Sequence, residues 1–95
     1  MRYFIDLRDI EDKRQLHEKL TAALPLPPWY GRNLDALYDV FTDPSFPGGE
    51  DPSNEILFLH TEEAAKRMPA YMRALQQLCL EAASERDDLD IEFED

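Results

Sequence analysis

Cysteine and long apolar runs are both nearly absent from this chain. Of its 95 residues only Cys79 is a cysteine, and a single cysteine cannot form a disulfide within one chain. No stretch approaches the ~20 apolar residues of a membrane-spanning helix, and charged residues interrupt the N-terminus before an apolar signal-peptide region could form. We therefore expect a cytoplasmic protein with no internal disulfide and no contact with membranes.

Glycine is also scarce, with three residues, whereas most of the seven prolines gather around residues 25–28 and 44–52. The prolines predict two irregular stretches between regular elements. A chain of this length buries roughly two-thirds of the surface that its unfolded form exposes, which is enough for one modest core. We expect one domain over residues 1–95.

Basic residues are few, since 10 lysines and arginines face 21 aspartates and glutamates, a formal net charge of −11. This charge repels the phosphate backbone of nucleic acids and anionic membranes. It favours rapid encounter with a basic protein, although the same charge could serve solubility alone. We therefore expect no direct nucleic-acid binding.

Apolar periodicity predicts three strands and four helices. The strands fall at residues 3–7, 56–59 and 89–93, and the helices begin near Asp9, Asn33, Thr61 and Pro69, of which the first three suit a helix N-cap. Between Asn33 and residue 56, residues 43–54 form a loop rich in proline and glycine. The continuous apolar run 56–59 is typical of a strand covered on both faces. The order βααβααβ predicts an α/β fold, a three-stranded parallel sheet packed against helices.

The second helix carries acidic residues on one face. At 3.6 residues per turn, the predicted core-facing stripe consists of Leu34, Leu37, Tyr38 and Phe41, and Gly31 allows the chain to turn just before the helix. The opposite arc, about 100° wide, carries Asp35, Asp39, Thr42 and Asp43.

This acidic arc costs stability. Asp39 and Asp43 place like charges four residues apart, at about 0.2–0.5 kcal/mol per pair, and they approach the negative end of the helix dipole. Carboxylates on a rigid helix can accept paired hydrogen bonds from arginine and lysine. The arc is therefore either a solvated face or a binding surface for cationic groups.

The segment Leu26–Thr42, LPPWYGRNLDALYDVFT, closely resembles the barstar family of ribonuclease inhibitors. From Tyr30 onward it matches every fixed position of the pattern Tyr-Gly-x-Asn-Leu-Asp-Ala-Leu-x-Asp-x-hydrophobic-Thr. The order of elements fits the family from end to end, whereas outside residues 26–42 the similarity is one of pattern. The resemblance implies a protein inhibitor and not an enzyme, without cofactor or metal, that blocks a small basic ribonuclease, or a ribonuclease-type toxin domain of a larger protein, inside the producing cell. We expect a monomer when it is free.

The resemblance also implies roles for individual residues. Asp39 would mimic a phosphate opposite the catalytic cations of the nuclease, with Asp35 and Thr42 beside it. Tyr38 would supply an aromatic contact and Trp29 would lie against the rim of the active site. Residues that shape the approach to the helix would be Tyr30, Gly31 and Asn33. An acidic residue late in the long helix would join the interface, either Glu81, which we favour, or Glu85.

Departures from the family pattern leave the identity of the partner open. Asp43 and Pro44 stand where the family often has glycine and an aromatic residue. Tyr38 replaces a common tryptophan, and Trp29 stands where tyrosine is usual.

Three other residue types invite functional readings. Cys79 lies on the apolar stripe of the long helix, which indicates a buried structural thiol. His60 follows the second strand without a partner and is interpreted as structural, and His17 is interpreted as a surface residue. Neither histidine has metal-ligand spacing. The acidic residues between 87 and 95 are interpreted as charges that protect an edge strand.

Three alternative functions remain. Asp35, Asp39 and Asp43 could be oxygen ligands for Mg²⁺ or Ca²⁺ in a metal-dependent hydrolase. A nucleic-acid mimic would need its charge spread over a long surface instead of one compact face. A barstar-like interaction module could bind a non-nuclease protein.

Overall fold

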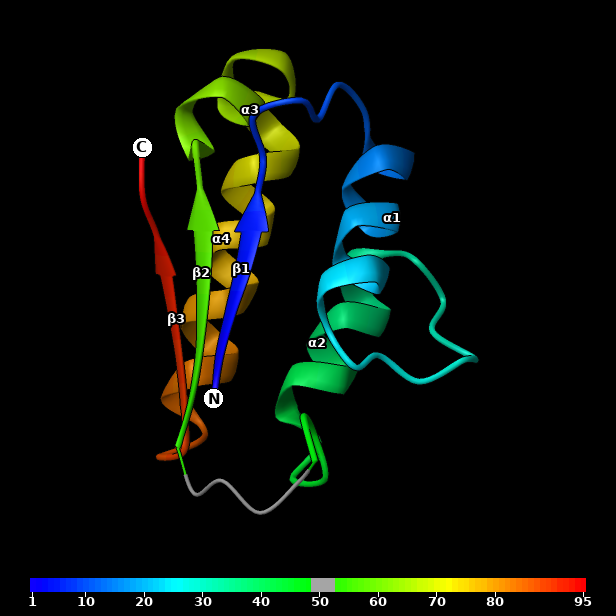
Figure 1. Cartoon of the computed structure of the whole chain (residues 1–95), viewed down its shortest axis with the longest axis vertical. Coiled ribbons are helices and arrows are strands. Elements are labelled where there is room, and N and C mark those ends of the chain that lie inside the picture. Colours follow the sequence, from blue (N-terminus) through cyan, green and yellow to red (C-terminus); the bar gives the residue numbers. More distant parts are fainter. Residues whose placement is uncertain (49–52) are drawn as a thin grey trace.

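The computed structural model describes residues 1–48 and 53–95. Along the chain, the regular elements are β1 (Arg2–Asp6), α1 (Lys13–Ala23), α2 (Leu34–Thr42), β2 (Asn54–Leu59), α3 (Thr61–Arg67), α4 (Pro69–Ser84) and β3 (Leu89–Phe93) (Figure 1). This confirms the predicted order βααβααβ. The predicted loop 43–54 ends one residue early because β2 begins at Asn54, and its residues 49–52 lie outside the described part of the chain.

The three strands form one parallel sheet in the order β1-β2-β3, so β2 is central and β3 is an edge strand, as predicted. Ile5 of β1, Phe58 of β2 and Phe93 of β3 lie side by side in register. The two phenyl rings are stacked with centroids 4.5 Å apart. Ile5 and Phe58 have no exposed surface, which places the core on this face of the sheet.

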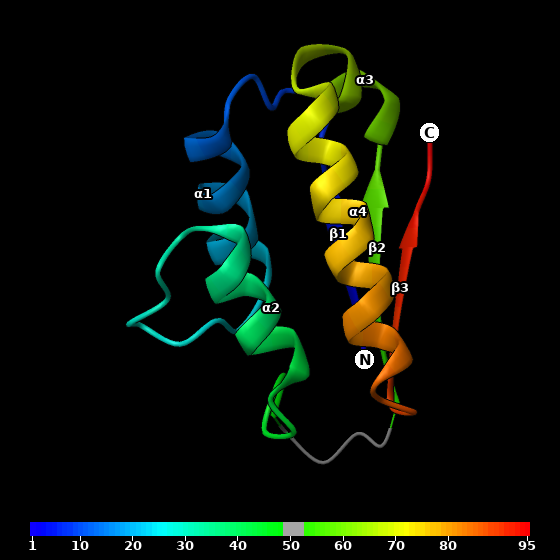
Figure 2. The same cartoon turned by 180° about the vertical axis from the view of Figure 1, so that it is seen from behind.

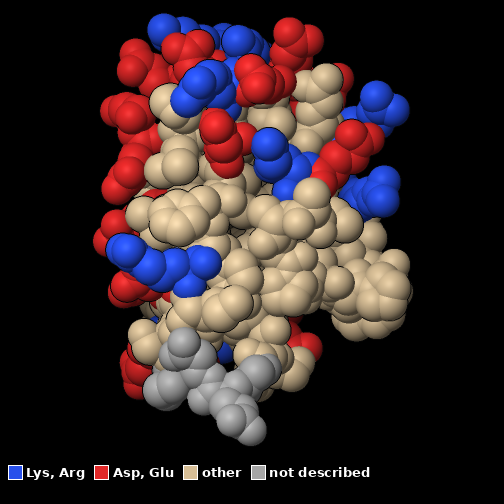
Figure 3. All heavy atoms as spheres, in the orientation of Figure 1, with Lys and Arg blue, Asp and Glu red and all other residues tan. Residues whose placement is uncertain are grey.

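Helices α1, α2 and α4 all lie on this inner side of the sheet (Figure 2). The central strand is buried on both faces, as predicted, since Ile56, Leu57 and Phe58 are all buried, but no helix of the described residues lies over the outer face. Leu57 points outward and is still only 8% exposed, since its neighbours in register, Phe4 and Glu92, flank it. The outer face carries acidic side chains along the β3 side (Figure 3).

Helix α1 begins later than predicted. Asp12 is its N-cap, since its Oδ1 accepts a hydrogen bond of 2.9 Å from the Gln15 amide, so the prediction of Asp9 as the cap is wrong. Residues before Asp12 are needed for the core, because Leu7 and Ile10 are buried and a turn links the Ile10 amide to the Leu7 carbonyl. The chain therefore turns inward before it can start a helix.

In α4 the apolar stripe that contains Cys79 is buried, together with Met72, Leu75 and Ala82, whereas the start of α3 differs from the prediction. Thr61 does not cap α3: it is the first helical residue, its Oγ1 donates to the Phe58 carbonyl, and His60 precedes it in the left-handed region at φ 57°. Pro69 opens α4 as predicted. Cys79 is 1% exposed, and burial raises the pKa of its thiol, so a buried structural cysteine is confirmed. Within the described residues, no helix is long and apolar enough to span a bilayer.

Candidate functional site

Helix α2 has the boundaries that its sequence predicts. The Asn33 side chain accepts a hydrogen bond of 2.8 Å from the Ala36 amide, which satisfies one of the free N–H groups at the start of the helix. Leu37 and Phe41 are fully buried and anchor the helix to the core. The predicted stripe is rotated by part of a turn, because Val40 is buried whereas Leu34 and Tyr38 are half-buried.

The turn before α2 uses Gly31 in a different way from the prediction. The residue in the left-handed region is Arg32, at φ 56°, and not the glycine. A methyl group on Gly31 would lie 3.3 Å from the Cβ of Ala36, closer than ordinary packing distance. Gly31 therefore suits the close approach of this turn to the first turn of the helix.

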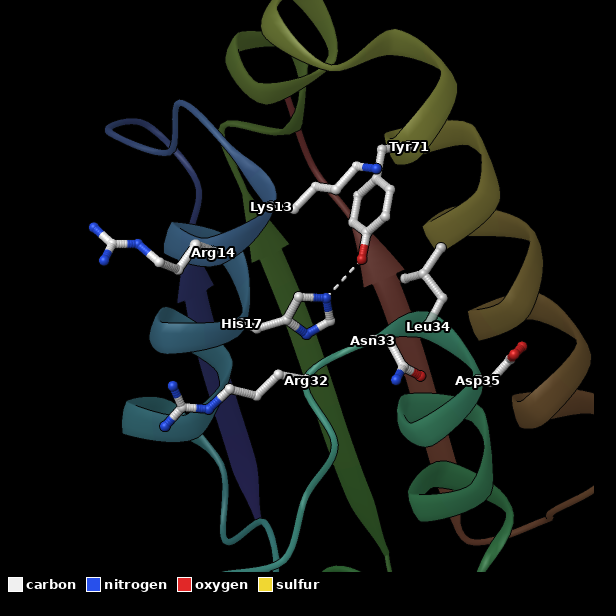
Figure 4. Close-up of a pocket in the computed structure, with 8 residues that line it drawn as sticks. All are labelled: Lys13, Arg14, His17, Arg32, Asn33, Leu34, Asp35 and Tyr71. Carbon is white, nitrogen blue, oxygen red and sulfur yellow. Dashed lines mark hydrogen bonds between the residues drawn. The ribbon is translucent and has the colours of Figure 1, made fainter.

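His17 is buried, so the prediction of a surface residue is wrong. It is 2% exposed, its Nδ1 lies 2.6 Å from the Tyr30 hydroxyl, and its Nε2 lies 2.6 Å from the Tyr71 hydroxyl (Figure 4). In a neutral imidazole one nitrogen donates and the other accepts, so the two tyrosines take complementary roles. His17 shares its helix face with Leu20 and Leu24 at spacings of three and seven residues, and this spacing was the available signal.

Burial makes His17 a source of pH-dependent stability. Loss of hydration, followed by the nearby positive charge of Arg32, lowers the pKa of His17 below its usual value. Below about pH 6.5 the unfolded chain therefore binds a proton that the folded chain does not. As the pH falls through this range, the free energy of unfolding decreases with a limiting slope of about 1.4 kcal/mol per pH unit.

When the pH is lowered from about 7 to about 5, we expect the free energy of unfolding to fall less in the His17→Gln variant than in the unchanged protein. Glutamine retains a hydrogen bond to one tyrosine but does not titrate. Urea midpoints measured across this range for both proteins test the prediction, and parallel pH profiles would contradict it.

A cleft of about 490 Å³ lies between α1, the start of α2 and α4, and its lining is mixed in character. The Lys13 ammonium lies 4.9 Å from the centre of the Tyr71 ring. The head groups of Arg14 and Arg32 point away from the cleft (Figure 4). Its cations do not converge on one point, so the cleft offers no common anchor for an anionic ligand.

The exposed side of α2 borders a second hollow, of about 540 Å³, against α4. Its floor is formed partly by Leu34 and Leu78, and three carboxylates line it, those of Asp35, Asp39 and Glu81. Both aspartates are exposed, and neither takes part in a salt bridge with any described residue. The fold thus brings two acids of α2 together with an acid that lies more than forty positions away in the sequence.

The two candidate acids at the end of α4, Glu81 in its last turn and Glu85 at its C-cap, have separate surroundings. Glu81 lines the hollow and accepts a hydrogen bond of 3.0 Å from Gln77. Glu85 instead accepts a hydrogen bond of 3.0 Å from the Tyr38 hydroxyl, which orients that ring at the edge of the acidic side chains. This bond also raises the pKa of the Tyr38 hydroxyl, so the phenol stays protonated and keeps donating.

Asp43 leaves the arc that the helical wheel assigns to it. It is the C-cap of α2 in an extended conformation, and its Oδ1 accepts hydrogen bonds from the Ser45 amide and hydroxyl at 2.9 and 2.8 Å. Thr42 remains on the helix, half-buried, with its hydroxyl donating to the Tyr38 carbonyl at 2.8 Å. The acidic residues that line this hollow are therefore Asp35, Asp39 and Glu81.

Trp29 extends from the connection between α1 and α2 and is 76% exposed. Tyr30, the next residue, is buried and forms a turn in which its amide donates to the Pro27 carbonyl. One chain segment thus anchors a tyrosine in the core and displays a tryptophan to solvent. The position of Trp29 is compatible with contact at the rim of a partner, which stays a prediction.

Arg86 is a structural residue that the sequence pattern does not reveal. Its guanidinium donates to the carbonyl oxygens of Phe41 and Asp43, both at 3.1 Å, and forms a salt bridge of 2.8 Å with Asp88. It therefore ties the end of α2 to the segment that leads into β3. No periodicity marks such a contact, because it depends on two segments that meet only in the folded chain.

The site has the chemistry of a cation acceptor. Within residues 1–48 and 53–95, no group of three or more His, Cys, Asp or Glu residues is placed to hold a metal ion. The metal-site alternative on Asp35, Asp39 and Asp43 therefore gains no support. Carboxylates around an apolar floor suit arginine or lysine side chains, whose stems are apolar and whose heads are charged.

Two comparisons with known proteins bear on this site. A family model described as "Barstar (barnase inhibitor)" matches residues 1–94. A Bacillus subtilis (strain 168) protein named "Putative ribonuclease inhibitor YrdF" is 53% identical over 38 residues. That match covers 40% of this chain and 42% of the relative, so the similarity spans less than half of the relative's length.

Proposed function

This chain belongs to the barstar family, and from that premise we propose that it inhibits a small basic ribonuclease by covering the active site with α2 and the loop before it. Barstar-family proteins are ribonuclease inhibitors, so a role of this type follows from membership. The surface used, the target and the action inside the producing cell, in the cytoplasm, are our proposal.

The observation that carries the proposal is the group of three carboxylates of Asp35, Asp39 and Glu81 around one hollow. A ribonuclease active site must hold a phosphodiester and is therefore lined by cations. Because the two aspartates form no internal salt bridge among the described residues, they are available to those cations. The site supports a phosphate mimic.

The neighbouring residues support the same role. Asp39 would face the catalytic cations of the nuclease, with Asp35 and Glu81 beside it. Tyr38, oriented by Glu85, would supply an aromatic contact, and Thr42 would flank Asp39. Trp29 would lie against the rim of the active site.

A rigid scaffold makes this mimicry efficient. Asn33 caps the start of α2, Phe41 anchors its inner face, and Arg86 binds its end. The helix that carries the carboxylates is thus fixed before binding, which lowers the entropy that association loses. Inhibition of this kind makes and breaks no covalent bond, so no cofactor takes part.

Capture from the producing cell tests the proposal. The immobilised chain should retain a basic protein whose ribonuclease activity appears when high salt dissociates the complex, because the net charge of −11 favours electrostatic association. An immobilised Asp39→Asn variant should no longer capture this basic protein. An immobilised Asp90→Asn variant, which removes one negative charge from the outer face of the sheet, should still capture it. Capture of partners without nuclease activity would favour an interaction module instead.

A further inference from the structure

A separate recess, of about 360 Å³, opens on the loop side of α2. Three prolines and Trp29 form one part of the wall of the recess, and two aspartates from α2 and its C-cap form another. The residues concerned are Pro25, Pro27, Pro47, Trp29, Asp39 and Asp43. Asp39 therefore borders two depressions, this recess and the hollow that contains Glu81. The recess is formed where the loop after α2 departs from the barstar pattern.

The loop that forms this recess is held by several contacts. Phe46 is 6% exposed and packs against Phe41, with ring centroids 5.4 Å apart. The Phe46 amide donates to the Asp43 carbonyl, and Arg86 donates to the same oxygen. The Asp43 carboxylate is fixed by Ser45. These contacts fix the wall of the recess that follows α2.

The lining selects a cation with an apolar, flat surface. Asp39 and Asp43 form no salt bridge with a described residue, and hydrogen bonds from Ser45 lower the pKa of Asp43, which keeps its carboxylate charged. An exposed indole attracts a cation through the face of its ring. Arginine satisfies both requirements, because its planar guanidinium stacks on aromatic rings and offers several N–H groups to carboxylates, whereas lysine carries a compact charge.

We propose that this recess is a socket for one arginine side chain of the target protein, bound by Asp43 and Asp39 with its guanidinium against Trp29. The inference rests on the proposed inhibition and adds the chemical identity of a second anchor on the target. A nuclease that presents an arginine beside its active-site cleft fits both depressions next to α2. A nuclease without it loses one of the two anchors.

Trp29 makes the socket directly measurable, because it is the only tryptophan of the chain and lines the recess. We expect N-acetyl-arginine amide, titrated into the full chain, to change the tryptophan fluorescence in a saturable, salt-sensitive way. The neutral isostere N-acetyl-citrulline amide should produce no such change. Equal responses to the two compounds would overturn the proposal.

Asp43→Asn tests the charge without removing the oxygen that accepts from Ser45. We expect about a tenfold weaker response to the arginine compound in this variant, since one charge-assisted bond is lost. Asp90→Asn is the matched control and should respond as the unchanged protein does. A response unaltered by Asp43→Asn would also overturn the socket.

The captured nuclease separates this inference from the proposed function. Asp43→Asn should weaken its binding more than Asp90→Asn does, while inhibition at saturating concentration persists. If the two variants bind the nuclease equally, the target does not use the socket, and inhibition through α2 still stands. If no nuclease is captured, the proposed function fails whatever the arginine titration shows.

Discussion

Asp39→Ala should weaken binding to the target nuclease at least about a hundredfold, the largest effect that we expect from a single surface substitution. Removing one partner of a desolvated charge pair typically costs about 3–5 kcal/mol, because the opposite charge stays buried without compensation. In the proposed complex the unpaired groups would be the catalytic cations of the nuclease. Asp35→Ala should have the next largest effect. Inhibition constants of the purified variants measure both.

Stability serves as the control for this prediction. Asp39 is exposed and forms no salt bridge among the described residues, and as an acid near the C-terminal end of α2 it costs some stability, so Asp39→Ala should leave the urea midpoint unchanged or raise it slightly, and should not lower it. Asp90→Ala removes the same charge from the outer face of the sheet and should leave inhibition nearly unchanged. Undiminished inhibition by Asp39→Ala would contradict the role of Asp39 as the phosphate mimic.

Phe41→Ala should have the largest effect on folding, lowering the free energy of unfolding by about 3–5 kcal/mol. Phe41 has no exposed surface, packs against Phe46, and its carbonyl accepts a hydrogen bond from Arg86. Its removal leaves a cavity beneath the helix that displays the acidic residues. Urea unfolding at neutral pH measures this loss.

A second variant keeps the Phe41 prediction measurable if the alanine variant does not fold. Phe41→Leu retains most of the buried volume and should cost less than the alanine substitution. A loss below about 1 kcal/mol for Phe41→Ala would show that α2 is not anchored by this ring. Inhibition by the folded fraction should persist, because Phe41 does not reach the exposed surface.

The boundaries of α2 could be predicted from the sequence because their causes are local. Asn33 is a strong N-cap, and the prolines before it prevent an earlier start. Alternating apolar and acidic residues likewise marked β3 as half-exposed, and the structure confirms it as an edge strand. Signals of this kind operate within a few residues and need no knowledge of the fold.

The surroundings of the acidic residues could not be predicted, because they depend on how α4 packs against α2. Glu81 lies in the last turn of α4 and Glu85 is the C-cap of that helix, four residues later. Only the packing shows that Glu81 lines the hollow while Glu85 accepts a hydrogen bond from Tyr38. Asp43 left the helical arc because the helix ends before it. The burial of His17 depends on two tyrosines from other segments, although its spacing from Leu20 carried part of that information.

The most direct measurement of whether α2 occupies the substrate site is the mode of inhibition of the captured ribonuclease. If carboxylates of this chain replace a phosphodiester in the active site, a rising concentration of RNA substrate should relieve the inhibition completely. The Asp39→Ala variant should require far more protein for the same inhibition. Inhibition that does not depend on substrate concentration would place this chain elsewhere on the nuclease and contradict the account.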